Sequence, residues 1–424
     1  MLVRFVLGLL LFVGSNLLFA QTITVDKNAN LNKVISNAKD GDIFILGNAQ
    51  YHTDKLIIDK EITLKGNGNT KIIGNKKGSV ITVNASNVVL EGLVISNSGI
   101  DLSTQDSAIF VNKTTRNVLV KNNLLKGNLI GVYLWGAKHA KVFNNTIIGL
   151  QDLHENERGN GVQLWNSTGS EVSFNTIRYG RDGIFVTTSN NNIFDNNIFT
   201  NLRYSIHYMY TNHSTVSNNL SIGNDIGYAL MSSNNLEISN NISINDREHG
   251  LFANFLNDSH IKNNVVLNGK GKCLFVYNSN FNTISNNYFK QCLIGVHWTA
   301  GSNENIFYNN AFVGNKKQVK YISTKNIEWS FKHRGNYWGN HTAYDINNNG
   351  IADSSYRPND ITDKILWKYP NATILLGSPI MLLLKYSNKH FPTLLPGGIT
   401  DSYPLISPAN IATETLKKAN EYNN

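Results

Sequence analysis

Pairs of asparagine residues recur along the middle of the chain at a nearly constant spacing, and this repeat constrains the fold more than any other feature. Successive pairs lie 22 or 23 residues apart, except for one interval of 30 that contains a charged insertion, residues 151–160. A period of this length with short β-like segments predicts an all-β solenoid, a right-handed parallel β-helix. The second asparagine of each pair, or its equivalent, falls at Asn123, Asn145, Asn175, Asn197, Asn219, Asn241, Asn264, Asn287 and Asn310.

Asparagine suits the turns of such a solenoid for two reasons. Its backbone tolerates the left-handed conformation that a tight turn requires. Stacked in register, its side-chain amide can also bond the asparagines above and below, which forms a ladder along the coils. Leucine-rich repeats have similar periods, but their leucine consensus is missing here, so the β-helix is our prediction.

The first residues have the character of a secretory signal peptide. Arg4 supplies a positive charge, residues 5–13 are apolar, and Ala20 is a small residue suited to cleavage. A membrane anchor is the alternative, but the apolar run is short for a spanning helix. We therefore divide the chain into residues 1–20 (signal peptide), 21–60 (N-terminal cap with a helix, and first strands), 61–324 (β-helix repeats), 325–408 (irregular C-terminal cap and docking segment) and 409–424 (disordered tail).

Two segments near the ends of the chain should close or dock the solenoid. Asn30 precedes apolar residues at helical spacing, and a helix there would cover the open strand edges of the first coil. Residues 372–384 are strongly apolar but too few to span a bilayer. They either lie back on the solenoid or dock on a membrane partner.

One strand of each coil has an unusual outward face. Its second and fourth residues after the glycine position point outward, and these positions hold aromatic, Met and His residues but no Asp or Glu. A continuous apolar stripe predicts a partner-binding surface, unless the insertion or the C-terminal segment covers it. From this outward row we assign to partner binding Tyr133, Trp135, Trp165, Phe185, Phe252, Tyr277 and His297.

The centre of the outward row has the composition of a copper site. Met209 and Met231 lie 22 residues apart, so their thioethers should stack on adjacent coils, roughly 4.8 Å apart. His207 precedes Met209 by two residues, and two soft sulfurs with an imidazole suit copper(I). Methionines that fill gaps or adapt to a protein partner are the alternative. His297 lies four coils from His207, roughly 19 Å, so these histidines cannot share one ion.

A second metal motif lies after the repeats. Asp345, Asn347, Asn349 and Asp353 have the spacing of a calcium-binding loop, with Gly350 at the tight turn. The usual acidic residue at the twelfth position is missing. Calcium is therefore one interpretation, and a plain turn rich in Asx residues is the other.

The cysteines and the charge exclude some classes of protein. Cys273 and Cys292 are too few for a disulfide scaffold. They lie 19 residues apart, out of register with the repeat, so we expect no bridge and treat Cys273 as a small residue in a glycine position. The net charge of +9 comes from scattered Lys and Arg without a basic stripe, which argues against nucleic acid as a partner.

Several motifs outside the repeats give the chain a family likeness. RYSIHYMYT, GYALMSSN, EWSFKHRGNYWGN and PGGITDSYPL occur in this order and together resemble the NosD family of periplasmic β-helix proteins. The resemblance implies a non-enzymatic role in the copper maturation of nitrous-oxide reductase in the periplasm. It also implies three partners: an ABC transporter of permease and ATPase, through which the protein is peripheral to the membrane, a small copper-chaperone lipoprotein, and the reductase.

The likeness has two departures, and other functions remain open. Ser205 replaces a glycine of the family's RYGIHYM motif, and Asn347 and Asn349 replace acidic residues of its DxDGDG loop. Parallel β-helices also include polysaccharide lyases and hydrolases, and an aromatic stripe suits carbohydrate binding. Hydrolysis would need paired carboxylates on neighbouring positions, and only turn residues such as Asp182 offer them. A structural adhesin is the third alternative, but it would not require Met and His on the stripe.

Overall fold

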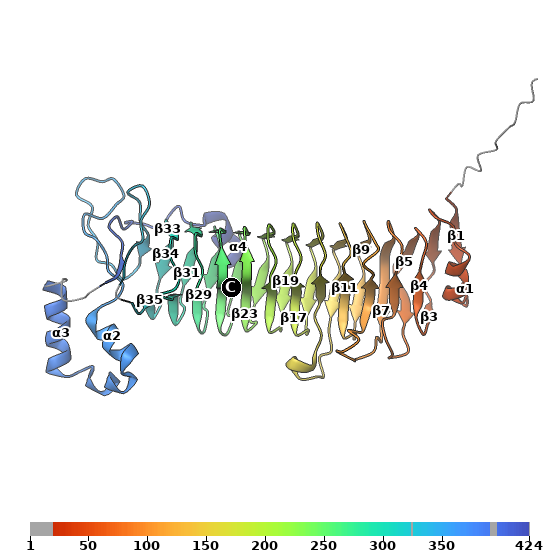
Figure 1. Ribbon diagram of the computed structural model, residues 1–424, viewed down its shortest axis with the longest axis horizontal. Coiled ribbons are helices and arrows are strands. Elements are labelled where there is room, and N and C mark those ends of the chain that lie inside the picture. The colour runs from red at the N-terminus through yellow and green to blue at the C-terminus, as the bar shows by residue number, and fades with distance from the viewer. Residues whose placement is uncertain (1–19, 324, 391–396, 424) are drawn as a thin grey trace, which may run out of the picture.

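The chain winds into a long parallel β-helix (Figure 1), and the computed structural model describes residues 20–323, 325–390 and 397–423. Each strand pairs in parallel with the equivalent strand of the next coil. The predicted all-β, right-handed solenoid is therefore confirmed. The expected signal peptide lies outside the described residues, except for its last position.

A sheet of 12 strands, called the long sheet here, runs along the solenoid and carries the outward row. Inward residues such as Ile206, Tyr208 and Leu230 are fully buried. The strands of the long sheet are β4 (Leu56–Ile58), β6 (Ile81–Val83), β8 (Ser107–Val111), β11 (Ile130–Trp135), β14 (Val162–Trp165), β17 (Asp182–Thr187), β20 (Tyr204–Met209), β23 (Ile226–Asn234), β26 (His249–Asn257), β29 (Lys272–Tyr277), β32 (Ile294–Trp298) and β35 (Lys317–Tyr321).

Two further rows of short strands complete each coil. One row contains β9 (Leu119–Lys121), β12 (Lys141–Phe143), β15 (Glu171–Ser173), β18 (Ile193–Asp195), β21 (Thr215–Ser217), β24 (Glu237–Ser239), β27 (His260–Lys262), β30 (Thr283–Ser285) and β33 (Ile306–Tyr308). The other contains β10 (Leu124–Lys126), β13 (Thr146–Ile148), β16 (Thr176–Arg178), β19 (Ile198–Thr200), β22 (Leu220–Ile222), β25 (Ile242–Ile244), β28 (Val265–Leu267), β31 (Tyr288–Lys290), β34 (Ala311–Val313) and β37 (Tyr337–Trp338). The β-helix core lies between these rows and the long sheet.

The predicted asparagine ladder is present, and the two asparagines of each pair have different roles. The second asparagine is buried and its amide bonds the next one, as Asn219 Nδ2 does to Asn241 Oδ1 at 3.0 Å. The first asparagine takes the left-handed backbone, with φ of 57° at Asn240. The ladder extends one step beyond the prediction, from Asn310 to Asn336.

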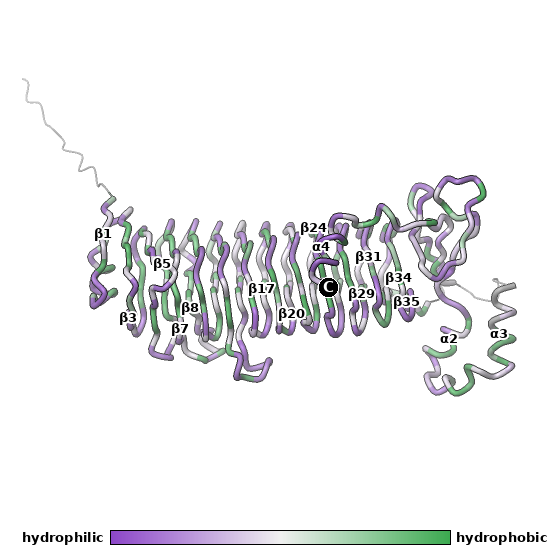
Figure 2. Tube along the Cα trace, turned by 180° about the vertical axis from the view of Figure 1, so that it is seen from behind, coloured by the Kyte–Doolittle hydropathy of each residue, from purple (hydrophilic) through white to green (hydrophobic). Residues whose placement is uncertain are grey.

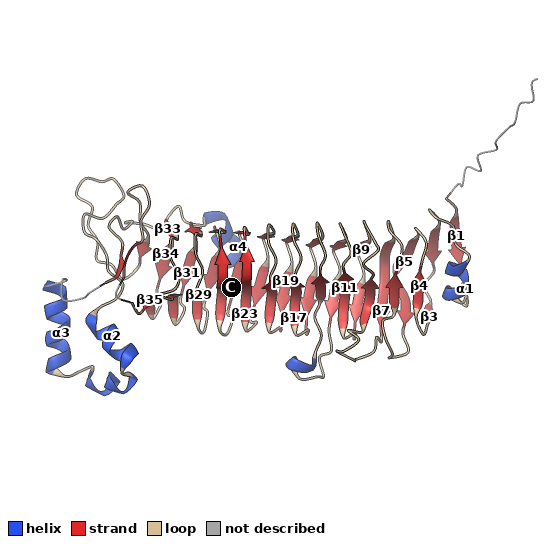
Figure 3. Cartoon of the chain, viewed as in Figure 1, coloured by secondary structure: helices blue, strands red, loops and turns tan. Residues whose placement is uncertain are grey.

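The N-terminal end is closed as the sequence predicts. Helix α1 (Leu31–Ser36) begins at Asn30, whose side chain accepts a hydrogen bond from Lys33 N and so caps the helix. It packs at the end of the stack (Figure 3). The strands of this region are β1 (Thr22–Val25), β2 (Ile43–Leu46), β3 (Gln50–His52), β5 (Thr63–Ile73) and β7 (Val89–Ser96).

The other end is closed by aromatic rings. Trp329 stacks on Phe307 at 4.0 Å between ring centroids, and Trp338 stacks on Phe312 at 4.4 Å. The buried Asp401 accepts a hydrogen bond from the Trp338 indole at 2.7 Å. Strands β36 (Asn326–Glu328) and β38 (Gly398–Thr400) pair in parallel beside this cap, so residues after the last repeat close the core.

The apolar segment 372–384 lies in a helical extension beyond the cap. Helix α2 (Ile361–Lys368), the 3₁₀ helix η2 (Pro370–Leu375) and helix α3 (Pro379–His390) project away from the solenoid (Figure 1). Hydrophobic stretches are visible along this extension in Figure 2, and Ile374 and Ile380 are 89% and 71% exposed. Within the described residues, no helix is both long and apolar enough to cross a bilayer.

The expectation of a disordered tail was wrong. Residues 413–423 form helix α4 (Thr413–Asn423), which packs on β25 and β28 along the side of the solenoid (Figure 3). Outward apolar residues of the underlying strands, Leu220, Ile242 and Val265, form a cluster with Ile411 and Ala419. The tail is ordered because these strands expose an apolar patch that the helix covers.

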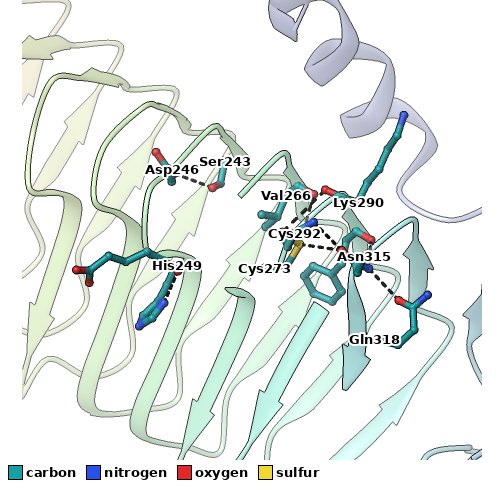
Figure 4. Close-up of a disulfide and its surroundings, with 11 residues drawn as sticks. Ser243, Asp246, His249, Val266, Cys273, Lys290, Cys292, Asn315 and Gln318 are labelled. Carbon is teal, nitrogen blue, oxygen red and sulfur yellow. Dashed lines mark hydrogen bonds between the residues drawn. A yellow bond between two sulfur atoms is a disulfide. The ribbon is translucent and has the colours of Figure 1, made fainter. Parts of the chain in front are cut away.

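The expectation of unpaired cysteines was also wrong, since Cys273 and Cys292 form a buried disulfide (Figure 4). Cys273 occupies the glycine position of β29, and Cys292 lies in the turn that precedes the same position of the next coil. The bridge is therefore diagonal, not vertical. Ser205 and Asn224, also 19 residues apart, show the same geometry with a 2.9 Å hydrogen bond.

Candidate functional site

The two methionines of the outward row lie side by side at the centre of the long sheet. Met209 in β20 is the direct cross-strand partner of Met231 in β23. Both side chains are half-buried. Neighbouring strands of a sheet lie about 4.8 Å apart, so the two thioethers are within reach of one ion. The predicted pairing of these residues is therefore present.

His207 lies on the same face of β20 and is held by a buried charge pair. Its Nδ1 atom is 2.9 Å from Oδ2 of Asp182, which is fully buried at the start of β17. Arg203 donates from Nε and Nη2 to the two oxygens of Asp182, at 2.9 and 2.7 Å. Burial raises the pKa of Asp182, but hydrogen bonds from His207 and Arg203 outweigh it and leave that pKa below its usual value.

Aromatic rings fix the plane of the histidine. The ring centroids of Phe185 and Tyr204 each lie 5.0 Å from that of His207, and Arg203 lies over the Tyr204 ring at 4.3 Å. The cross-strand neighbour of His207 in β23 is Ala229. Ala229 is fully buried, and His207 itself is buried with 8% of its surface exposed.

This donor set fits copper(I). Thioethers and a neutral imidazole are the soft and intermediate ligands that copper(I) prefers. Among the described residues, no group of three or more His, Cys, Asp and Glu side chains is arranged to hold a metal ion. The side-chain oxygen of Asn254, which follows Met231 across the sheet, is buried without a hydrogen-bond partner.

A second group of histidines lies farther along the outward row. His297 stacks on Phe275 at 4.7 Å, and His249 meets the edges of Phe252 and Phe275 at 5.3 Å. Burial lowers the pKa of both histidines to about 4, together with the positive charge of Lys272 at His249 and of Lys320 and Lys272 at His297. These imidazoles are thus neutral at physiological pH and lie on an aromatic surface.

The remaining residues assigned to partner binding differ in exposure. Trp165 and Tyr277 are exposed, and Trp135 stacks on Trp165 with 6.1 Å between centroids. Tyr133 is buried in a cluster with Leu129 and Ile130, against which Leu150 at the start of the insertion packs. The covering that we left open as an alternative therefore applies to Tyr133, whereas Trp165 on the neighbouring strand is exposed.

The insertion is linked by an ion pair to a later turn of the solenoid. It contains a short 3₁₀ helix, η1 (Glu155–Glu157), which projects from the side of the solenoid (Figure 1). Glu155 lies 3.8 Å from Arg247, which also binds Asp225 at 2.5 Å. The insertion is thus tied to Arg247 in the turn before β26 and, through it, to Asp225 in the turn before β23.

In the calcium-like motif Asp345 is half-buried, the other three residues are exposed, and the side chains bond the backbone of their own loop. Asp345 accepts hydrogen bonds from Asn349 N and Gly350 N, and Asp353 accepts one from Ile346 N. Asn347 accepts from Asn349 N at 3.0 Å. These are the bonds of an Asx-rich turn, and a calcium site here stays a prediction.

Sequence reasoning missed Asp182 as part of the site. It precedes a glycine, so it had the appearance of a turn residue. Its partner His207 lies 25 residues later, a diagonal separation that a comparison at the repeat period does not examine. A search for carboxylates three residues out of step with the repeat would have found it.

Comparisons with known proteins identify the family of the chain. A profile of the family described as "Periplasmic copper-binding protein (NosD)" matches residues 149–343. A protein of Stutzerimonas stutzeri named "Probable ABC transporter binding protein NosD" is 35% identical over 85% of each chain. The protein of the same name from Pseudomonas aeruginosa PAO1 is 35% identical over 84% of this chain and 86% of its own.

Solved structures with low sequence identity share the fold. The family 28 exopolygalacturonase of Yersinia enterocolitica superimposes with a TM-score of 0.60 at 11% identity, over 72% of this chain and 77% of its own. The Streptococcus pneumoniae adhesin PfbA gives a TM-score of 0.54 at 13% identity, over 67% of this chain and 92% of its own. These likenesses show the β-helix alone, whereas the relatives at 35% identity show that the chain belongs to the NosD family of periplasmic copper-binding proteins.

Proposed function

We propose that this protein accepts copper(I) at Met209, Met231 and His207 and passes it on during the maturation of nitrous-oxide reductase in the periplasm. The observation that carries the proposal is the cross-strand pairing of Met209 with Met231 beside His207. The chain contains four methionines in all, so two in register on one outward face are unusual. A patch of soft donors with two half-buried thioethers suits an ion that is received and then released.

The aromatic part of the outward row is the proposed surface for the protein that delivers or receives the copper. Trp165 and Tyr277 are exposed on either side of the methionine pair along the sheet. Aromatic residues are enriched in protein interfaces. A copper-chaperone lipoprotein or the reductase would thus contact the row and reach the methionines together.

The experiment replaces both thioethers. A Met209→Ala/Met231→Ala variant should lose copper(I) binding but keep its fold, because both side chains are half-buried on the outer face. Met381→Ala removes a thioether from α3 and is the matched control, which should bind copper(I) as the native chain does. Copper(I) is titrated without oxygen against a competing chelator, and unchanged affinity of the double variant would refute the assignment.

The helical extension is the proposed contact with the ABC transporter. Ile374, Ile380 and Leu383 are largely exposed on η2 and α3, and an apolar patch of this kind marks an interaction site. The curated relatives are named as ABC transporter binding proteins. We expect the extension to dock on the permease, which, with its ATPase, would hold the protein at the membrane surface.

Removal of residues 372–384 tests this contact. The shortened chain should no longer co-purify with the permease and ATPase, while its copper(I) affinity stays native because the methionine pair lies on distant coils. A chain that lacks residues 409–424 is the control, since α4 covers a different face. Retained co-purification of the first variant would contradict the proposal.

The carbohydrate-active alternative has less support from the site. Asp182 is fully buried, and both of its oxygens are bound by Arg203, so it is not available as an acid or base for an external sugar. The relatives at 35% identity are named as binding proteins. Turnover of any substrate in a panel of polyuronides would reverse this conclusion.

A further inference from the structure

We infer that Asp182 and Arg203 are positioning residues that select the His207 tautomer in which Nε2, not Nδ1, is the nitrogen that donates to copper(I). The inference rests on the proposed copper role of His207 and deepens it, because it names the atom and the groups that prepare it. Arg203 and His207 lie four residues apart on one coil, whereas Asp182 comes from the preceding coil. The coils of the solenoid assemble them.

The first step is the protonation state of the carboxyl group. Asp182 is fully buried, and a buried charge is stable only when it is paired. Arg203 supplies two parallel hydrogen bonds, the fork arrangement that is specific for a carboxylate. Asp182 is therefore an ionised carboxylate, which can accept hydrogen bonds but has none to donate.

The second step concerns the imidazole. Nδ1 of His207 lies 2.9 Å from Oδ2 of Asp182. Because the carboxylate only accepts, Nδ1 must carry the proton and donate it to this bond. In a neutral ring the lone pair is then on Nε2. The ring cannot exchange the two nitrogens freely, since Phe185 and Tyr204 pack against it.

The third step is the consequence for a metal. A histidine that binds a metal usually donates its other ring N–H to a carboxylate, which fixes the ring and strengthens the metal-bound nitrogen as a donor. His207 has this arrangement, with Asp182 as the carboxylate. Arg203 balances the charge of Asp182, so the patch has no surplus negative charge that would attract harder cations.

The tautomer can be measured without copper. The full chain, labelled with ¹⁵N at histidine, gives long-range ¹H–¹⁵N correlations that distinguish a protonated Nδ1 from a protonated Nε2, and a His207→Gln variant assigns the signals. We expect a protonated Nδ1 and a bare Nε2 in the native protein at pH 8. A protonated Nε2 would overturn the inference and leave the methionine proposal standing.

The effect on binding is measured with Asp182→Asn. The carboxamide can donate as well as accept, so it no longer dictates the tautomer. We expect a mixture of tautomers and a loss of copper(I) affinity of about 10- to 100-fold, as for other outer partners of metal-binding histidines. Asp225→Asn is the matched control, because it breaks the neighbouring ion pair with Arg247 without a hydrogen bond to His207.

A second variant covers the case in which Asp182→Asn fails to fold. Asp182→Asn/Arg203→Gln removes both charges, so no unpaired charge is buried. Native affinity in either folded variant would overturn the inference. If the native protein has the expected tautomer but does not bind copper(I), the copper role of the patch itself fails, and this positioning role fails with it.

Discussion

Asn241 and its neighbour Asn240 should differ sharply in their contribution to stability, although both belong to the same repeated pair. The amide of Asn241 donates to Val216 O at 2.8 Å and to Asn264 Oδ1 at 3.0 Å. Its oxygen accepts from the backbone and side-chain nitrogens of Asn219 at 3.1 and 3.0 Å. Each such bond contributes about 1 kcal/mol, so Asn241→Ala should lower the free energy of unfolding by about 4 kcal/mol.

Asn240→Gly is the matched control for this change. Asn240 has a φ of 57°, which glycine adopts without a steric penalty, so this variant should stay within about 1 kcal/mol of the native protein. Urea unfolding followed by circular dichroism measures both variants. Equal losses of stability would show that the buried ladder, despite its regular geometry, does not hold the coils together as we argue.

Three other changes test features of the fold. Reduction of the Cys273–Cys292 bridge, or its replacement by two alanines, should cost about 3 kcal/mol for a loop of this size, measured by urea unfolding with and without reductant. Burial raises the pKa of Asp246 to about 7, so between pH 4 and 7 the folded state binds a proton that the unfolded state has lost. The free energy of unfolding should therefore fall by up to roughly 4 kcal/mol as the pH rises from 4 to 7. Asp246→Asn should abolish this slope, and a slope that persists would assign it to other groups. Removal of residues 409–424 should expose the cluster under α4, increase the binding of an apolar dye and leave copper(I) affinity native.

Much of the fold follows from the sequence because a solenoid repeats its local rules. The coil period, the inward and outward alternation of the long sheet and the ladder are all properties of one coil, and nine or more copies reinforce each signal. The sequence did not show that the ladder hydrogen bonds and the left-handed backbone belong to different asparagines of each pair. Phe174 shows why the distinction matters: it takes the left-handed position, with φ of 58°, where an asparagine is missing.

Other features depend on which surfaces meet, and the repeat does not encode this. Helix α4 is polar in composition, and its order comes from an apolar patch on strands more than 100 residues earlier. The same limit applies to Tyr133, which is buried in a cluster against which Leu150, next to the insertion, packs. The pattern of a strand shows which way a side chain points, but not what covers it.

The side-chain contacts that the sequence analysis did not predict share one geometric cause. Asp182 meets His207 and Ser221 meets Asp246 at a separation of 25 residues, and Cys273 meets Cys292 at 19. These separations are about three residues more or less than one coil, so each contact is diagonal between neighbouring coils. Vertical register stacks like residues and builds the ladder, whereas diagonal register brings unlike residues together. Chemistry that needs an acid beside an imidazole, or two thiols that bond, is therefore found along the diagonals of a β-helix.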